Sequence, residues 1–161
     1  SARLRELEEH GVVRRRALPR PGGGVVYELT ERGRQLEPAV LSLGRWGALA
    51  LDEPRPGEIV TEDSLVMALR TAYRPDRTHP PTTYELRVGD LVVHAVVSVD
   101  GPRVAAGPAP APDLVIETDA GLRDLLTGRT GPAEAVAHGS VRLTGDPALL
   151  ARFTETFAIR A

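Results

Sequence analysis

The spacing of apolar residues changes twice near the start of the chain, and each change marks a new element. A helical spacing followed by Gly11 predicts a helix over residues 3–9 that ends at the glycine. Shorter apolar stretches at 12–18 and 25–29 flank a bend rich in proline and glycine. Such a pattern is typical of two strands joined in a β-hairpin.

A long helix is predicted after the hairpin. Thr30 is placed to cap its first turn. Pro38 lacks an N–H group and predicts a kink unless a new helix begins there. Apolar residues recur along the helix at i, i+4 and i+7 and form one stripe, whose tryptophan we expect to pack in the core. The stripe consists of Leu36, Val40, Leu43 and Trp46.

Residues 51–61 contain two prolines and a glycine without an apolar period, which predicts a linker. Beyond it, helical and strand spacings alternate to the end of the chain, with Thr61 and Asp119 placed as helix caps. The predicted elements are helices over 62–72, 119–128, 132–138 and 147–157, and strands at 84–88, 91–99, 103–106, 114–118 and 141–143.

Composition narrows the class of protein. The chain of 161 residues can form one large or two small domains, and it has no cysteine for a disulfide framework or a thiolate zinc site. No apolar run approaches a membrane span and no signal peptide is visible, so a cytoplasmic location is expected.

Charge is divided unevenly along the chain. Residues 1–50 hold nine arginines and six acids, a balance of +3, whereas residues 51–161 hold eleven arginines and sixteen acids, a balance of −5. This split suits nucleic acid binding by the first part, although such an asymmetry also arises by chance.

No catalytic arrangement is apparent in the sequence. The four histidines lie far apart in the sequence, and none belongs to an HExxH motif. A metal site is therefore not expected. The Gly22-Gly23-Gly24 run lacks the ending of a nucleotide-binding loop, and no serine lies in a GxSxG elbow. We therefore expect no enzyme activity and no cofactor. The histidines are His10, His79, His94 and His138.

A series of motifs covers roughly the first 47 residues. It reads Leu4-x-x-Leu7-Glu8-x-x-Gly11-Val12-Val13-x-Arg15, then Val25-x-Tyr27-x-Leu29-Thr30-x-x-Gly33-x-x-Leu36-x-Pro38, then Trp46. The series resembles the back half of HxlR-type winged-helix transcription regulators. The resemblance implies a DNA-contacting hairpin wing, a long helix at the seam of a homodimer, and preceding helices upstream of Ser1 in a longer polypeptide.

Arginines cluster on the first strand of the predicted hairpin. A bare charge run is usually a solvated face, but beside a glycine-rich wing it favours phosphate contact. Strand alternation sends Arg14 and Arg16 to one face and Arg15 to the other. The residues expected to contact double-stranded DNA are Arg3, Arg5, Arg14, Arg16, Arg20, Gly22 and Gly23.

A second series lies near the C-terminus. It reads Asp113-Leu114-Val115-Ile116, Leu125-Leu126-x-Gly128, Ala135-x-x-x-Gly139-x-Val141-x-Leu143-x-Gly145-Asp146, then Leu149 and Phe153. The series resembles the sterol carrier protein-type lipid-binding fold and implies an apolar cavity. His94 is either a sheet histidine or a polar handle in that cavity. The expected ligand-binding residues are Val93, His94, Ala95, Val97, Ile116, Leu126, Phe153 and Phe157.

Together these patterns predict an α+β protein. Residues 1–50 form a partial winged helix (helix end, β-hairpin wing, long helix), 51–61 a linker, and 62–161 a sterol carrier protein-like domain of antiparallel sheet with helices packed on it. The expected function is a dimeric transcription regulator whose second domain binds a hydrophobic small molecule. The alternatives are a lipid carrier that uses the winged-helix part only for dimerisation, and a protein-interaction module whose cavity is filled core.

Overall fold

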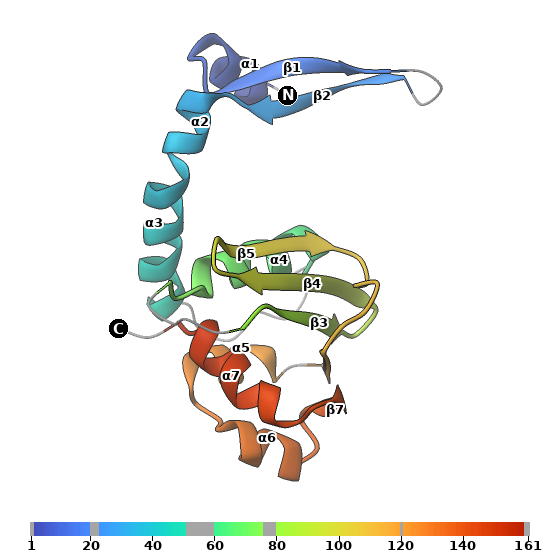
Figure 1. Ribbon diagram of the computed structural model, residues 1–161. Coiled ribbons are helices and arrows are strands. Elements are labelled where there is room, and N and C mark those ends of the chain that lie inside the picture. The colour runs from blue at the N-terminus through green and yellow to red at the C-terminus, as the bar shows by residue number, and fades with distance from the viewer. Residues whose placement is uncertain (1, 20–22, 51–59, 76–79, 120, 160–161) are drawn as a thin grey trace. The chain divides into compact units, whose positions relative to one another are not determined.

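The computed structural model describes residues 2–19, 23–50, 60–75, 80–119 and 121–159 (Figure 1). The chain divides into two compact units, Ser1–Gly44 and Arg45–Ala161. Each unit is described by itself below. The predicted linker at 51–61 falls almost wholly outside the described residues, and the predicted domain boundaries stay a prediction.

The first unit has the predicted order of helix, hairpin and helix. Its strands pair antiparallel from Val13↔Leu29 to Leu18↔Gly24, and the hairpin extends away from the helices toward its tip (Figure 1). Gly11 takes a positive φ of 67° just after the first helix, as expected of a helix-ending glycine. The elements are α1 (Ala2–Glu9), β1 (Val13–Leu18), β2 (Gly24–Leu29), α2 (Glu31–Gln35) and the start of α3 (Glu37–Ala50).

Hydrogen bonds and close packing hold α2 against the base of the hairpin. The Thr30 hydroxyl accepts from the Gly33 N–H at 3.1 Å and donates to the Gly11 carbonyl oxygen at 2.6 Å. A side chain at Gly33 would overlap the Val12 carbonyl oxygen, which explains why this buried position is a glycine. Thr30 therefore fixes the direction in which the chain leaves the hairpin as well as capping the helix.

The proline in the predicted long helix falls where a new helix begins. α2 ends at Gln35 with Leu36 as its C-cap, and α3 starts at Glu37. Pro38 thus lies in the first turn of α3, where a backbone N–H has no partner within the helix.

Trp46 does not pack in the core, so that expectation is wrong. Its side chain is 72% exposed, and Leu36, Val40 and Leu43 are exposed as well. The stripe has the spacing of a buried helix face, but its side chains are exposed among the described residues.

The second unit is a sheet with helices, which confirms the expected α+β fold class. Its strand order is β5-β4-β3-β6-β7. The elements are α4 (Glu62–Ala72), β3 (Thr82–Val88), β4 (Leu91–Ser98), β5 (Gly101–Ala106), β6 (Leu114–Thr118), α5 (Leu122–Thr127), α6 (Pro132–Ala137), β7 (Arg142–Gly145) and α7 (Ala148–Thr156).

One pairing differs from the expected antiparallel sheet. β6 lies parallel to β3, whereas β4, β5 and β7 run antiparallel to their neighbours. The chain leaves β5 at one edge, crosses the sheet in the segment 107–113 and enters β6 on the far side of β3. Because this segment returns the chain to the opposite end before β6 begins, β6 must run in the same direction as β3.

Two helix starts differ slightly from the predicted caps. Asp119 is not the N-cap of α5; that position is Gly121, whose N–H donates to the Thr118 hydroxyl at 2.8 Å. At α7 the Asp146 carboxylate accepts from the Ala148 N–H at 2.9 Å, with Pro147 between them. At α7 this bond satisfies an N–H of the first turn, whereas at α5 the bonded N–H is that of the N-cap itself.

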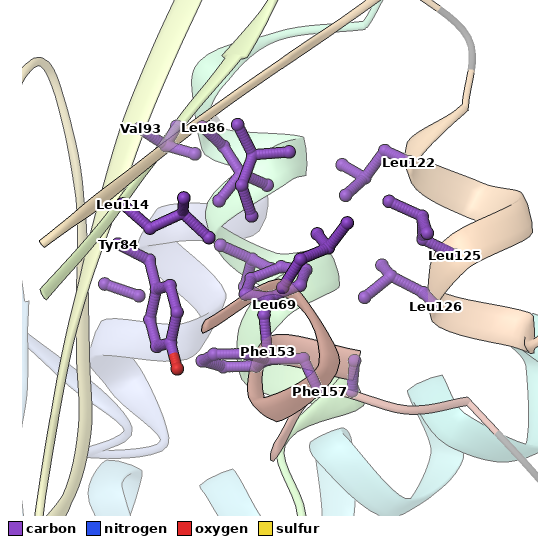
Figure 2. Close-up of a cluster of buried hydrophobic side chains, with 14 of the residues drawn as sticks. Leu69, Tyr84, Leu86, Val93, Leu114, Leu122, Leu125, Leu126, Phe153 and Phe157 are labelled. Atoms are coloured by element: carbon purple, nitrogen blue, oxygen red, sulfur yellow. The ribbon is translucent and has the colours of Figure 1, made fainter. Parts of the chain in front are cut away.

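The core lies on one face of this sheet and is covered by α4, α5 and α7. Figure 2 shows the leucines of α5 directed toward the side chains of the sheet, with Leu69 of α4 and Phe153 of α7 beside them. Tyr84 meets Phe153 edge-on, with ring centroids 5.3 Å apart. Edge-to-face contact of this kind adds to the stabilisation from burial.

Candidate DNA-binding hairpin and ligand-binding core

The β1 arginines separate onto the two faces of the hairpin, as strand alternation predicts. Arg14 and Arg16 lie on one face, where both contact the same carboxylate on β2. Arg14 Nε donates to Glu28 Oε1 at 2.7 Å, and Arg16 Nε donates to Glu28 Oε2 at 2.8 Å. One glutamate therefore joins both arginines of this face.

The arginines hold Glu28 in its charged form. Hydrogen bonding from Arg14, with a further contribution from Arg16, lowers the pKa of the Glu28 carboxyl below its usual value. The side chain of Glu28 is 29% exposed, against 66% for Arg14 and 53% for Arg16. The carboxylate lies beneath the two guanidinium groups, and the local charge of the three groups sums to +1.

Arg15 faces the other side of the hairpin and has a different environment. Its guanidinium lies over the Tyr27 ring, 5.5 Å from the centroid, and its Nε is 3.0 Å from Glu8 Oε2 on α1. The Glu8 charge and the Tyr27 contact both raise the pKa of Arg15. Arg15 thereby links the hairpin to the helix that precedes it.

Three of the remaining candidate DNA contacts belong to the described residues. Arg3 and Arg5 are exposed on α1, and Gly23 is exposed at the hairpin tip with a φ of 34°. Arg20 and Gly22 lie outside the described residues. Glu28, Glu8 and Tyr27 were not predicted as partners of these arginines. Glu28 and Tyr27 become their neighbours through the strand register, and Glu8 through the docking of α1.

The structure brings seven of the eight candidate ligand-binding residues together. They belong to one buried cluster, and none is more than 6% exposed. Three come from β4, one from β6, one from α5, one from α7 and one follows α7 directly. The seven are Val93, Ala95, Val97, Ile116, Leu126, Phe153 and Phe157.

Tyr84 lies in this cluster and was not among the predicted residues. Its hydroxyl is the one buried side-chain polar atom without a hydrogen-bond partner in the part of the chain that the structure describes. Burial raises the pKa of Tyr84 to about 12, against smaller opposing effects of Arg152 and Thr82.

His94 is separated from the other candidates. It points to the opposite face of the sheet, where its Nδ1 lies 2.9 Å from the Gly107 carbonyl oxygen. Directly across from it on β3 is Glu85, which is 2% exposed and accepts from the Ala109 N–H at 2.8 Å. The two side chains hold the crossing segment after β5 against the sheet, so His94 has a structural contact of its own.

No cluster of three or more metal-ligating side chains occurs among the described residues. Within that same part of the chain, no helix is long and apolar enough to cross a membrane.

The first part of the chain is similar to known regulators. Residues 1–54 match the family described as HxlR-like helix-turn-helix. The chain is 50% identical over 44 residues to the uncharacterized HTH-type transcriptional regulator YybR of Bacillus subtilis, covering 27% of this chain and 35% of that protein. It is 37% identical over 51 residues to the uncharacterized HTH-type transcriptional regulator sll1512 of Synechocystis, covering 32% of this chain and 38% of that protein. The chain thus spans little more than a third of the length of these relatives.

Solved structures match the remainder by fold. The sec-alkylsulfatase Pisa1 from Pseudomonas matches with a TM-score of 0.53 and 18% identity, over 62% of this chain and 16% of that one. The UbiJ-SCP2 ubiquinone synthesis protein matches with a TM-score of 0.48 and 17% identity, over 64% of this chain and 93% of that one. The match of the first residues is of the kind expected from the first sequence resemblance, to HxlR-like regulators.

Proposed function

We propose that this protein is a cytoplasmic, DNA-binding transcriptional regulator in which the β1–β2 hairpin is the wing of a winged helix. The match of residues 1–54 to the HxlR-like helix-turn-helix family supports this function. The observation that carries it is the exposed pair Arg14 and Arg16 on one face of the hairpin. Two guanidinium groups on one strand face suit contacts to the phosphate backbone, which fix the position of a protein on DNA.

We further propose that the regulator is a homodimer whose seam includes α3. The support is the exposed apolar stripe on that helix, because large apolar side chains gathered on one face mark interaction surfaces. A two-fold dimer would place two wings on the half-sites of a palindromic operator. The stripe residues are Leu36, Val40, Leu43 and Trp46, which are 46%, 53%, 65% and 72% exposed.

The second unit, in this proposal, binds a hydrophobic small molecule among the seven clustered apolar residues. Binding of the ligand would change the proportion of dimers in each of their arrangements. It would thereby change how the two wings are directed toward DNA. The size of the shift is limited by the difference in ligand affinity between the arrangements.

Close packing of those same seven residues favours a second candidate for this unit, a protein-interaction module whose interior is filled core. Titration with a fluorescent fatty acid distinguishes the two. Saturable binding that changes DNA affinity supports the ligand-regulated protein. Absence of binding supports the filled core.

DNA binding itself is tested by fluorescence anisotropy with a labelled mixed-sequence duplex at several salt concentrations. We expect binding that weakens steeply with salt, since each neutralised phosphate adds about −0.9 to the log–log slope. Failure to bind the duplex at low salt would favour the lipid carrier, in which the winged-helix part serves only dimerisation.

A further inference from the structure

We propose that Glu28 is a positioning residue of the DNA interface, which holds Arg14 and Arg16 as an oriented pair for neighbouring phosphates of one strand. This inference rests on the proposed function and adds a role for an acidic residue within it. An acidic side chain in a phosphate-binding surface would ordinarily be expected only to weaken binding.

The strand register places Glu28 at the centre of this face. It is directly opposite Arg14 and diagonal to Arg16, which pairs with Val26. Each carboxylate oxygen accepts from one Nε, at 2.7 Å and 2.8 Å, so both oxygens are used. The two arginines are consequently fixed relative to each other through one partner.

Arg14 and Arg16 keep N–H donors for a phosphate after they bond to Glu28. A guanidinium carries several N–H donors in a planar fork, and the bonds to Glu28 use the Nε–H of each arginine. Among the described residues, Glu28 is the acceptor for both side chains. Their outer Nη groups can therefore donate to a bound anion. Arg15 cannot join them, because it lies on the opposite face against Tyr27 and Glu8.

The geometry also matches the repeat of the target. Alternate residues on a strand lie about 6.6 Å apart, since each residue rises about 3.3 Å. A DNA strand carries one phosphate per about 3.4 Å of helix axis and winds around that axis, so adjacent phosphates are separated by more than the rise. The spacing of the two arginines along the strand is therefore of the same order as the spacing of phosphates along a DNA strand.

Two opposing effects decide whether Glu28 strengthens or weakens binding. Its charge repels phosphate, but this repulsion acts through water and is screened over about 8 Å at physiological salt. Its orientation of two long side chains reduces the ordering that each would otherwise undergo on binding. We expect the orientation to prevail.

The experiment compares Glu28→Ala with Glu31→Ala by anisotropy, using the full-length protein and the labelled mixed-sequence duplex. Glu31 is the matched control, because it pairs with Arg34 in the same unit and its removal changes the charge by the same amount. We expect Glu28→Ala to bind about fivefold more weakly than Glu31→Ala at low salt. Glu28→Gln, which keeps the side-chain length and one acceptor oxygen, should fall between them.

The same comparison in an Arg14→Ala/Arg16→Ala background isolates the cause. There, Glu28→Ala and Glu31→Ala should bind equally, since no pair remains to be positioned. If Glu28→Ala binds as tightly as Glu31→Ala or more tightly in the otherwise native protein, Glu28 is not a positioning residue. If the double arginine variant itself binds like the native protein, the wing contact of the proposed function fails first, and the role of Glu28 fails with it.

Discussion

The hairpin of the first unit and the sheet of the second are both built from strands with alternating faces, but they use those faces differently. In the sheet, one face packs against three helices and buries Phe153, Tyr84 and their neighbours. On strands β1 and β2, only Val13 is buried. Ion pairs join Glu28 to Arg14 and Arg16 on one face, and on the other face Arg15 contacts Tyr27 on β2 and Glu8 on α1. Burial specifies the second unit, whereas the hairpin leaves charged side chains exposed at its surface, where a ligand can reach them.

This difference predicts where substitutions take effect. Changes in the sheet core should lower stability and leave duplex DNA binding intact wherever the protein stays folded. Changes in the hairpin should alter DNA binding with little effect on unfolding, because exposed ion pairs contribute little to stability.

The largest expected effect is that of Phe153→Ala. Phe153 is fully buried and contacts both Tyr84 and Phe157, so its loss leaves a cavity that the sheet cannot close. The free energy of unfolding, measured by urea denaturation, should fall by about 3–5 kcal/mol. Val99→Ala, at an 82% exposed position, serves as the control and should change it little. A fall below about 1 kcal/mol for Phe153→Ala would mean that this region is not a packed core.

A smaller effect concerns the Tyr84 hydroxyl and alkaline pH. The folded-state pKa of about 12 lies above the usual value of 10, so folding favours the protonated phenol. The resulting stability is complete below pH 10 and is lost as pH rises through 12. The unfolding free energy should therefore fall by about 1.4 kcal/mol between about pH 8 and about pH 11.

Tyr84→Phe provides the comparison for that loss. Without a phenol to ionise, the variant should lack this part of the alkaline destabilisation. At neutral pH it should be at least as stable as the native protein, since the hydroxyl it removes has no partner among the described residues. Identical alkaline profiles for the two proteins would show that Tyr84 ionises as readily when folded as when unfolded.

The smallest expected effect is that of Arg15→Ala. Arg15 contacts Glu8 and Tyr27 and faces away from Arg14 and Arg16, so it should act on DNA only by bracing the hairpin against α1. We expect duplex affinity to fall about twofold to threefold with an unchanged salt slope, because no phosphate contact is lost. A slope reduced by about one unit would instead place Arg15 on the phosphate backbone.

Much of both units could be predicted from the sequence, because periodicity and glycine placement are local signals. The strand alternation that separates Arg15 from Arg14 and Arg16 is one example, and the helix stop at Gly11 is another. The residues that join these arginines could not be predicted, since the choice of Glu28 and Glu8 depends on cross-strand register and on the docking of α1.

Other features depend on contacts between distant segments. The position of β6 beside β3 follows from a crossing segment whose path no local pattern encodes. Glu85 reads as an exposed strand residue, yet the same segment covers it and the Ala109 N–H bonds to it. Trp46 has core-like spacing on a helix face that stays exposed, because periodicity shows that a face is apolar without showing what packs on it.

The central claim, that the Arg14 and Arg16 face binds the DNA backbone, is tested most directly by the salt dependence of duplex affinity. The Arg14→Ala/Arg16→Ala variant is compared with Arg103→Ala/Arg142→Ala, which removes the same charge from exposed strand positions of the second unit. We predict a log–log slope shallower by about 1.8 for the hairpin variant and close to native for the control. Equal slopes for the hairpin variant and the native protein would contradict the account.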